Sequence, residues 1–279
     1  MTDEKLEVFK NSPVNRLSIG IQSFSEADLR YMNRAHTASE SMDCIDAVLK
    51  AGFDNLTVDL IYGSPTTSDA QWKENMQRVF DYQVKHLSCY NLTVEPGTAL
   101  DHFVKNKKSK PVDEEQSARQ FEMLIEASTR AGYVHYEISN FAKEGWYARH
   151  NSAYWQGRPY LGLGPSAHSF DGTSRQWNIA HNQKYLKSIK EGILPFEKEI
   201  LSPAQQYNEY LLTGLRTIWG CDIQKIEAIG VIYKNHFLKL VSVYKSEGQL
   251  IEREGIYTLT KTGKLLADRI AMELFFETD

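Results

Sequence analysis

The sequence predicts an α/β fold with parallel strands over residues 1–198, followed by a smaller helical module over residues 199–279. In the first half, strand-like apolar runs alternate with amphipathic helical patterns through short connections, which indicates a parallel sheet. These runs are apolar on both faces, as in strands that helices cover on at least one side. Open sheets and barrels both satisfy this pattern, and both bind ligands at the carboxyl ends of their strands.

The strands and helices of the first half can be assigned in chain order. Strands are expected at residues 15–23, 55–63, 86–94 and 133–142, and helices at residues 39–52, 68–82 and 114–132. Ser39 is expected to cap the first helix and Gly52 to end it. Ser68 and Gln71 form a capping box at the start of the second helix. The lysine-rich residues 105–110 are expected to form an exposed loop.

The last quarter of the chain has a different pattern. Helices are expected at residues 202–220, 222–230, 233–248 and 261–277, with a β-hairpin at residues 250–260. Helix, helix, two-stranded wing and helix is the order of a winged-helix module, whose usual partner is DNA. The third of these helices carries Lys234, His236, Lys239 and Lys245. A DNA-binding regulator is therefore an alternative function, although the acidic balance of the chain argues against it.

Composition excludes several classes of protein. The chain has 279 residues, a net charge of −4 and 42% hydrophobic residues, which is typical of a globular protein without a dedicated nucleic-acid or membrane surface. No apolar run is long enough to span a bilayer, and the charged first ten residues do not resemble a signal peptide. We expect a cytoplasmic location. Cys44, Cys89 and Cys221 lie far apart in the sequence, so we expect reduced thiols and no closely spaced metal or cluster site.

Polar side chains follow the predicted strands at the points where these strands end. Gln22 ends the first strand, Thr93 lies near the end of the third, and Ser139 and Asn140 lie near the end of the fourth. Asp59 lies within the otherwise apolar second strand, where an unpaired carboxylate would be costly to bury. Loop polarity and helix capping could account for the others, but Asp59 favours a binding site.

Five motifs carry a family resemblance. The runs NRLSIGIQSF, MNRAH, VDLIYGSP, LSCYNLTVEPGT and YEISNFAKEGWYARHNSAYW occur in this order. In order and spacing they resemble the oxygen-independent coproporphyrinogen III oxidase family of radical SAM proteins. The resemblance covers essentially the whole chain. It implies a partial (βα) barrel of radical SAM type with parallel strands, followed by a winged-helix-like module.

The resemblance also implies roles for the polar residues. Gln22, Arg34, Asp59 and Thr93 match positions that contact S-adenosylmethionine in the family. A carboxylate or amide can hold ribose hydroxyls or an amine, and the planar guanidinium of Arg34 suits a carboxylate. The run LGLGPSAHSF resembles a glycine-rich strand near the cofactor, which makes His168 a further candidate contact.

The segment HNSAYW, at residues 150–155, resembles the haem chaperone (HemW) branch of that family. The resemblance implies a haem-binding chaperone of porphyrin and haem metabolism, with His150 as the ligand of the haem iron. Arg149 would pair with a propionate, and Tyr154 and Trp155 would cover the macrocycle. Oxygen-independent coproporphyrinogen III dehydrogenase activity, the decarboxylation of propionates by radical chemistry, is the alternative function. The haem acceptor is not implied.

The family also uses a 4Fe-4S cluster held by closely spaced cysteines near its N-terminus. This sequence contains no such segment. We therefore expect a fragment or a cluster-free relative that is inactive as a radical enzyme by itself. A barrel without those strands would leave an open edge, through which the chain could associate with itself.

Overall fold

The computed structural model describes residues 1–277 and divides the chain into two compact units, one from Met1 to Tyr147 and one from Ala148 onwards. The sequence suggests a domain boundary between residues 198 and 199, later than this division, and that boundary stays a prediction. None of the helices in the described part of the chain is long and apolar enough to cross a membrane.

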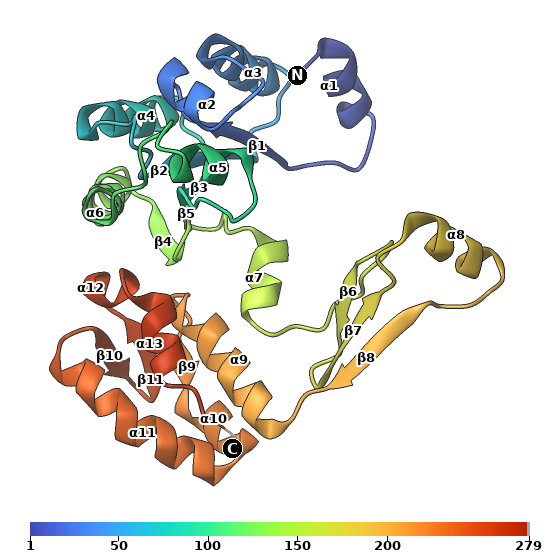
Figure 1. The fold of residues 1–279 in the computed structure, drawn as a ribbon, viewed down its shortest axis with the longest axis vertical. Helices are drawn as coiled ribbons and strands as arrows, with labels where there is room; N and C mark the ends of the chain where they lie inside the picture. Colours follow the sequence, from blue (N-terminus) through green and yellow to red (C-terminus); the bar gives the residue numbers. More distant parts are fainter. Residues whose placement is uncertain (278–279) are drawn as a thin grey trace. The chain divides into compact units, whose positions relative to one another are not determined.

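The N-terminal unit is built on a five-stranded sheet with the order β1-β2-β3-β5-β4 (Figure 1). Its strands are β1 (Leu17–Gln22), β2 (Leu56–Tyr62), β3 (His86–Asn91), β4 (Val134–Glu137) and β5 (Asn140–Ala142). Strands β1, β2 and β3 are parallel, as the sequence predicts. β1 lies at one edge of this sheet, and self-association through an open edge stays a prediction.

The predicted fourth parallel strand is wrong. Residues 133–142 form the tight antiparallel hairpin β4–β5, and β5 runs antiparallel to β3. The reversal is stabilised by Glu137, whose carboxylate accepts hydrogen bonds from the backbone N–H of Ser139 at 3.0 Å and from Nδ2 of Asn140 at 2.5 Å. The sheet is therefore mixed rather than wholly parallel.

Three long helices are α3 (Ala38–Lys50), α4 (Asp69–Asp81) and α6 (Glu114–Arg130), and α4 contacts both of the others. Nη1 of Arg78 on α4 reaches the sulfur of Met42 on α3, and Nε1 of Trp72 on α4 donates to the carbonyl of Gln120 on α6. The Ser68 capping box of α4 is confirmed.

The start of α3 differs from the expectation. Thr37 caps this helix instead of Ser39, because Glu40, three residues after Thr37, completes a reciprocal capping box with it. Gly52 follows the end of α3 with φ of 89°, a conformation that favours glycine. Short helices α1 (Asp3–Lys10), α2 (Glu26–Tyr31) and α5 (Ala99–Lys105) lie in segments that sequence periodicity leaves unassigned.

The C-terminal unit begins with helix α7 (Arg149–Trp155) and a three-stranded antiparallel sheet with the order β6-β7-β8. Its strands are β6 (His168–Phe170), β7 (Ser174–Asn178) and β8 (Phe196–Ile200), with helix α8 (Asn182–Lys190) between the last two. Most of the run LGLGPSAHSF is loop rather than strand. A Cβ on Gly162 would lie 2.2 Å from the carbonyl oxygen of His168, so this glycine allows the chain to pack on itself.

The rest of this unit contains α9 (Pro203–Leu215), β9 (Cys221–Asp222), α10 (Ile223–Ile229), α11 (Val231–Ser246), β10 (Leu250–Arg253), β11 (Ile256–Leu259), α12 (Lys261–Lys264) and α13 (Ala267–Glu273). The predicted hairpin is confirmed, and Glu254 and Gly255 turn it with positive φ at both positions. The single final helix expected at 261–277 is wrong, because Leu266, with φ of −117°, interrupts it between α12 and α13.

Candidate functional site

The two faces of the N-terminal sheet differ in chemistry. The face toward the helices is apolar: Tyr62 on β2 lies 5.9 Å, centroid to centroid, from Phe121 on α6, and Phe141 on β5 stacks on His135. Side chains alternate between faces along a strand, so Asp59 and its cross-strand neighbours share the opposite face. That face is polar.

A row of polar side chains crosses this face from strand to strand. The register pairs Asp59 with Ser88, Ser88 with Asn140, and Asn140 with Glu137. The Ser88 hydroxyl donates to Oδ1 of Asn140 at 3.0 Å, and Nδ2 of Asn140 donates to Glu137. Sequence reasoning identified Asp59 and Asn140 in this row but missed Ser88 and Glu137.

Asp59 is half-buried within the row. Burial raises the pKa of its carboxyl, and this effect exceeds the opposing effects of the nearby Ser88 and Ser18 hydroxyls and of the positive charge of Arg16. The Ser18 hydroxyl is 3.4 Å from Oδ1 of Asp59. Arg16 is held by Asn55 at 2.9 Å and by the Thr57 hydroxyl at 2.5 Å. The carboxylate thus remains free to accept further hydrogen bonds from a ligand.

Gln22 reaches the same face as Asp59. It ends β1 with φ of 70°, and its Nε2 atom lies 2.7 Å from the position that a Cβ on Gly20 would take. Gly20 pairs with Asp59 in the register, so the amide of Gln22 folds back over the polar face beside Asp59. A side chain at position 20 would displace that amide.

The other two predicted contacts of this unit are not members of the row. Arg34 lies in the turn after α2 and Thr93 follows β3, and both are exposed. Within residues 1–277, neither side chain makes a hydrogen bond or an ion pair with another residue. The structure therefore brings Gln22 and Asp59 to one face, whereas Arg34 and Thr93 remain unengaged.

A buried histidine completes the polar face and was missed by sequence reasoning. Nε2 of His86 lies 2.7 Å from the hydroxyl of Tyr136, and burial lowers the pKa of His86 to about 3. Its Nδ1 atom has no hydrogen-bond partner in the described part of the chain. The imidazole is neutral at physiological pH. The alternation of polar and apolar residues along HLSCYN was the signal that could have indicated this face.

In the C-terminal unit, α7 carries the four predicted haem contacts. His150 and Tyr154, four residues apart, lie on one face of the helix, and their rings meet edge to face at 4.8 Å. Arg149 and His150 are exposed, and Tyr154 is 39% exposed. Trp155 lies on a different face, more buried, with the guanidinium of Arg216 5.4 Å from its ring centroid.

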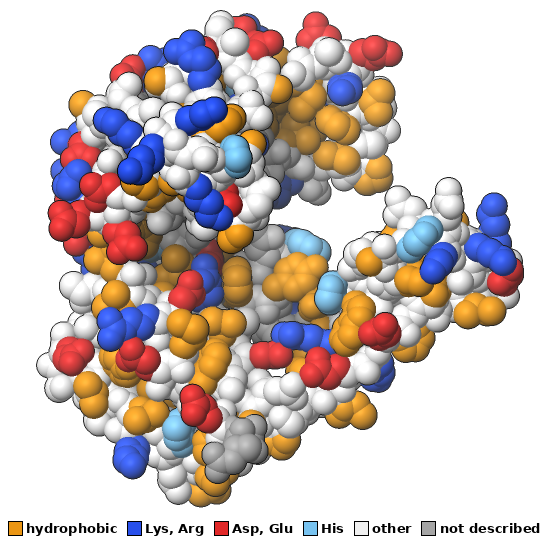
Figure 2. Space-filling view, in the orientation of Figure 1, with side chains coloured by type: hydrophobic (Ala, Val, Ile, Leu, Met, Phe, Trp, Pro, Cys, Tyr) orange, Lys and Arg blue, Asp and Glu red, His pale blue; other side chains and the backbone are white. Residues whose placement is uncertain are grey.

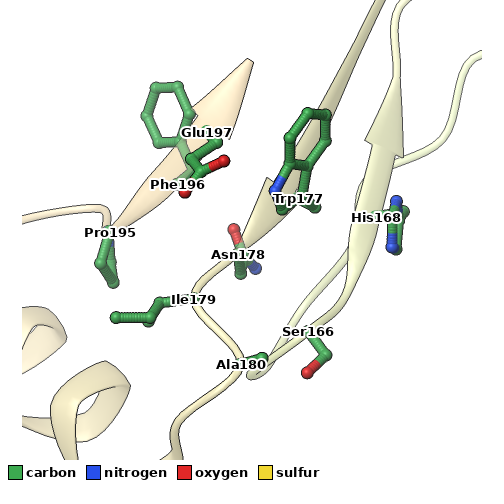
Figure 3. Close-up of a pocket in the computed structure, with 9 residues that line it drawn as sticks. All are labelled: Ser166, His168, Trp177, Asn178, Ile179, Ala180, Pro195, Phe196 and Glu197. Carbon is green, nitrogen blue, oxygen red and sulfur yellow. The ribbon is translucent and has the colours of Figure 1, made fainter. Parts of the chain in front are cut away.

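His168 lies in this unit as well, on β6 beside a hollow of about 450 Å³. Figure 3 shows it on the strand next to Trp177, with Phe196 and Glu197 on the third strand. The His168 ring is 6.2 Å from that of Trp177. Gln22 and Asp59 belong to the other unit.

Comparison with known proteins shows which families the chain is similar to. Residues 1–105, which contain the three parallel strands, match the family model described as the radical SAM superfamily. Heme chaperone HemW of Bacillus subtilis is 28% identical over 97% of this chain and 72% of its own length. Residues 1–105 therefore carry a radical SAM domain. The chain as a whole is similar to proteins named heme chaperone HemW, as the sequence motifs predict.

Two further comparisons define the extent of the likeness. Heme chaperone HemW of Lactococcus lactis is 32% identical over 81% of this chain, and the match spans 60% of that protein. A solved structure described as coproporphyrinogen III oxidase (HemN) from Escherichia coli superposes with a TM-score of 0.78, at 22% identity, over 99% of this chain and 67% of that one. This likeness supports the fold.

The radical SAM family that residues 1–105 match implies S-adenosylmethionine and a 4Fe-4S cluster as its cofactors. The polar face with Gln22 and Asp59 fits the hydroxyls and amine of S-adenosylmethionine. The three cysteines do not fit a cluster, because Cys44 lies on α3, Cys89 is buried within β3, and Cys221 belongs to the other unit. No group of three metal-binding side chains occurs among residues 1–277.

Proposed function

We propose that the chain is a haem-binding, chaperone-like protein that carries haem on the α7 segment. The observation that supports this most is the exposed His150, held edge to face against Tyr154 at 4.8 Å on one side of a short helix. Haem iron accepts a neutral imidazole, and an aromatic ring beside the ligand can cover part of the macrocycle. The relatives named as heme chaperones are consistent with this proposal.

The remaining contacts on α7 would have different roles. Arg149 is exposed and would pair with a propionate of the haem. Trp155 is more buried than His150, so it would line the site rather than close over an exposed ring. His150 would be the only one of the four to contact iron.

On the N-terminal unit, we propose S-adenosylmethionine as the ligand of the polar face. Gln22 and Asp59 would hold its hydroxyls or amine, and Arg34 would hold its carboxylate. Thr93 and His168 are weaker candidates, because Thr93 is exposed beyond the end of β3 and His168 belongs to the other unit.

The module that starts at α9 has the order of elements of a winged helix, and we infer a structural rather than a DNA-binding role for it. Most basic side chains of α11 are engaged within the module. Lys234 pairs with Glu227 at 2.7 Å, Lys245 with Glu252 at 3.3 Å, and Nε2 of His236 lies 3.0 Å from the carbonyl of Phe275. Figure 2 shows acidic and basic side chains interspersed on its visible face, without the block of positive charge that DNA would attract.

The haem proposal is tested by titrating the purified chain with haemin and following the Soret band. We expect saturable binding with one haemin per chain, and a changed Soret maximum and at least about tenfold weaker binding for His150→Ala. His102→Ala is the matched control, because His102 is an exposed histidine on α5 of the N-terminal unit. An unchanged spectrum and affinity for His150→Ala would remove His150 as the iron ligand.

A further inference from the structure

A second hollow in the C-terminal unit, of about 480 Å³, lies between α7, the β6–β7 strands and helices α9 and α10. Its volume is in the range of sites that hold small organic ligands. It is distinct from the hollow beside His168, and His150 does not line it. Tyr154 of α7 does line it, so His150 lies immediately beside it.

Flat aromatic side chains supply much of the lining of this hollow. The ring centroids of Tyr154 and Tyr160 are 4.5 Å apart at 69°, and those of Tyr160 and Phe170 are 6.1 Å apart. Trp155 and Tyr210 line it as well. Such surfaces favour a planar apolar ligand, because rings stack or meet edge to face with it.

The charges around the hollow favour an anion. Arg175 is neutralised by Glu209, whose carboxylate lies 2.7 Å from its guanidinium. Lys225 also lines the hollow and is exposed, and within the described residues it forms no ion pair. Its ammonium lies 5.9 Å from the centroid of the Tyr210 ring, at the aromatic wall. The hollow therefore combines aromatic walls with one cation that is free to bind a carboxylate.

We propose that this hollow binds the ring of a tetrapyrrole carboxylate, with Lys225 holding a carboxylate and the aromatic side chains contacting the ring. The proposal rests on the proposed haem function and extends it, because it separates ring binding in the hollow from iron ligation by the neighbouring His150. Recognition of the ring does not require the iron, so a metal-free porphyrin binds too.

The test is a fluorescence titration of the full chain with metal-free protoporphyrin IX. We expect saturable binding that Lys225→Glu weakens by about five- to tenfold and that Lys225→Arg retains. Lys239→Glu is the matched control, since Lys239 is an exposed lysine on α11 that does not line the hollow. Equal affinities for the Lys225→Glu and Lys239→Glu variants would overturn the proposal.

A second variant blocks the hollow without a change of charge. Ala228 on α10 lines it and is exposed, so Ala228→Trp fills space in the hollow while the chain still folds, which thermal unfolding checks. We expect protoporphyrin IX binding to be lost, and undiminished binding to a folded Ala228→Trp variant would also overturn the proposal. Failure of the haem function is distinguishable, because the haemin spectrum of His150→Ala reports on the iron and protoporphyrin IX contains none.

Discussion

Asp59 should cost stability at neutral pH, and replacing it by asparagine should make the protein more stable. Burial raises the pKa of Asp59 above its value in the unfolded chain. The protonated carboxyl therefore makes its full contribution to the free energy of unfolding below the pKa of the unfolded chain, about 3.9. This contribution is lost as the pH rises through the pKa of the folded protein. Near neutral pH the ionised carboxylate is a cost that the neutral amide of asparagine avoids.

The size of the effect follows from the contacts of Asp59. An asparagine keeps an oxygen that accepts from the hydroxyl of Ser18, so this bond is retained. The partial burial of the Asp59 carboxylate costs about 1–3 kcal/mol of stability. Asp59→Asn removes this cost but also removes the attraction to Arg16, which offsets about 1 kcal/mol of the gain. The net gain for Asp59→Asn is about 1 kcal/mol, which corresponds to a rise in Tm of about 2–4 °C.

Thermal unfolding followed by circular dichroism, at about pH 7 and again at about pH 4, measures this gain. It should shrink at the lower pH, where the native carboxyl takes up its proton. Asp69→Asn is the control, and we expect it to lower the Tm. Asp69 accepts a hydrogen bond from Nε of Arg119 at 2.7 Å, and this bond lowers the pKa of Asp69. A drop in Tm for Asp59→Asn at pH 7, comparable to that of Asp69→Asn, would refute the reasoning.

Two further predictions concern buried side chains. Trp72→Phe removes the hydrogen bond from Nε1 to the carbonyl of Gln120 at 2.9 Å and leaves a void in a fully buried position, so we expect the free energy of unfolding to fall by about 2–4 kcal/mol in urea denaturation. In the native protein, a thiol reagent followed by mass spectrometry should label Cys44 first, because burial raises the thiol pKa values of Cys89 and Cys221. Labelling of Cys89 at the rate of Cys44 would contradict this.

Local patterns in the sequence identified much of the N-terminal fold. Strands β1 to β3 and the Ser68 cap of α4 follow from periodicity and from residues a few positions apart. The same reasoning misplaced the cap of α3, because Ser39 and Thr37 are both good caps and only Glu40, reaching back to Thr37, decides between them. Chemistry within one segment was therefore readable from the sequence.

The tertiary structure decided how neighbouring segments pair and which of their side chains lie on the same face. Residues 133–142 have the pattern of one strand, but β4 and β5 pair antiparallel as a hairpin whose turn is held by the hydrogen bonds of Glu137. Asp59 was recognisable as an unusual carboxylate in an apolar run, but its partners on the polar face depend on the register of four strands. His86 was missed for the same reason.

The aromatic hollow beside α7 shows this division most clearly. The sequence indicated Tyr154 and Trp155 through a motif of six residues, whereas Lys225, seventy positions later, faces the same hollow from α10. Periodicity and capping act over a few residues, so the sequence by itself determined helices, strands and individual candidate side chains. Cross-strand register and helix packing join residues far apart in the chain, so only the tertiary structure decided which of these side chains share a site.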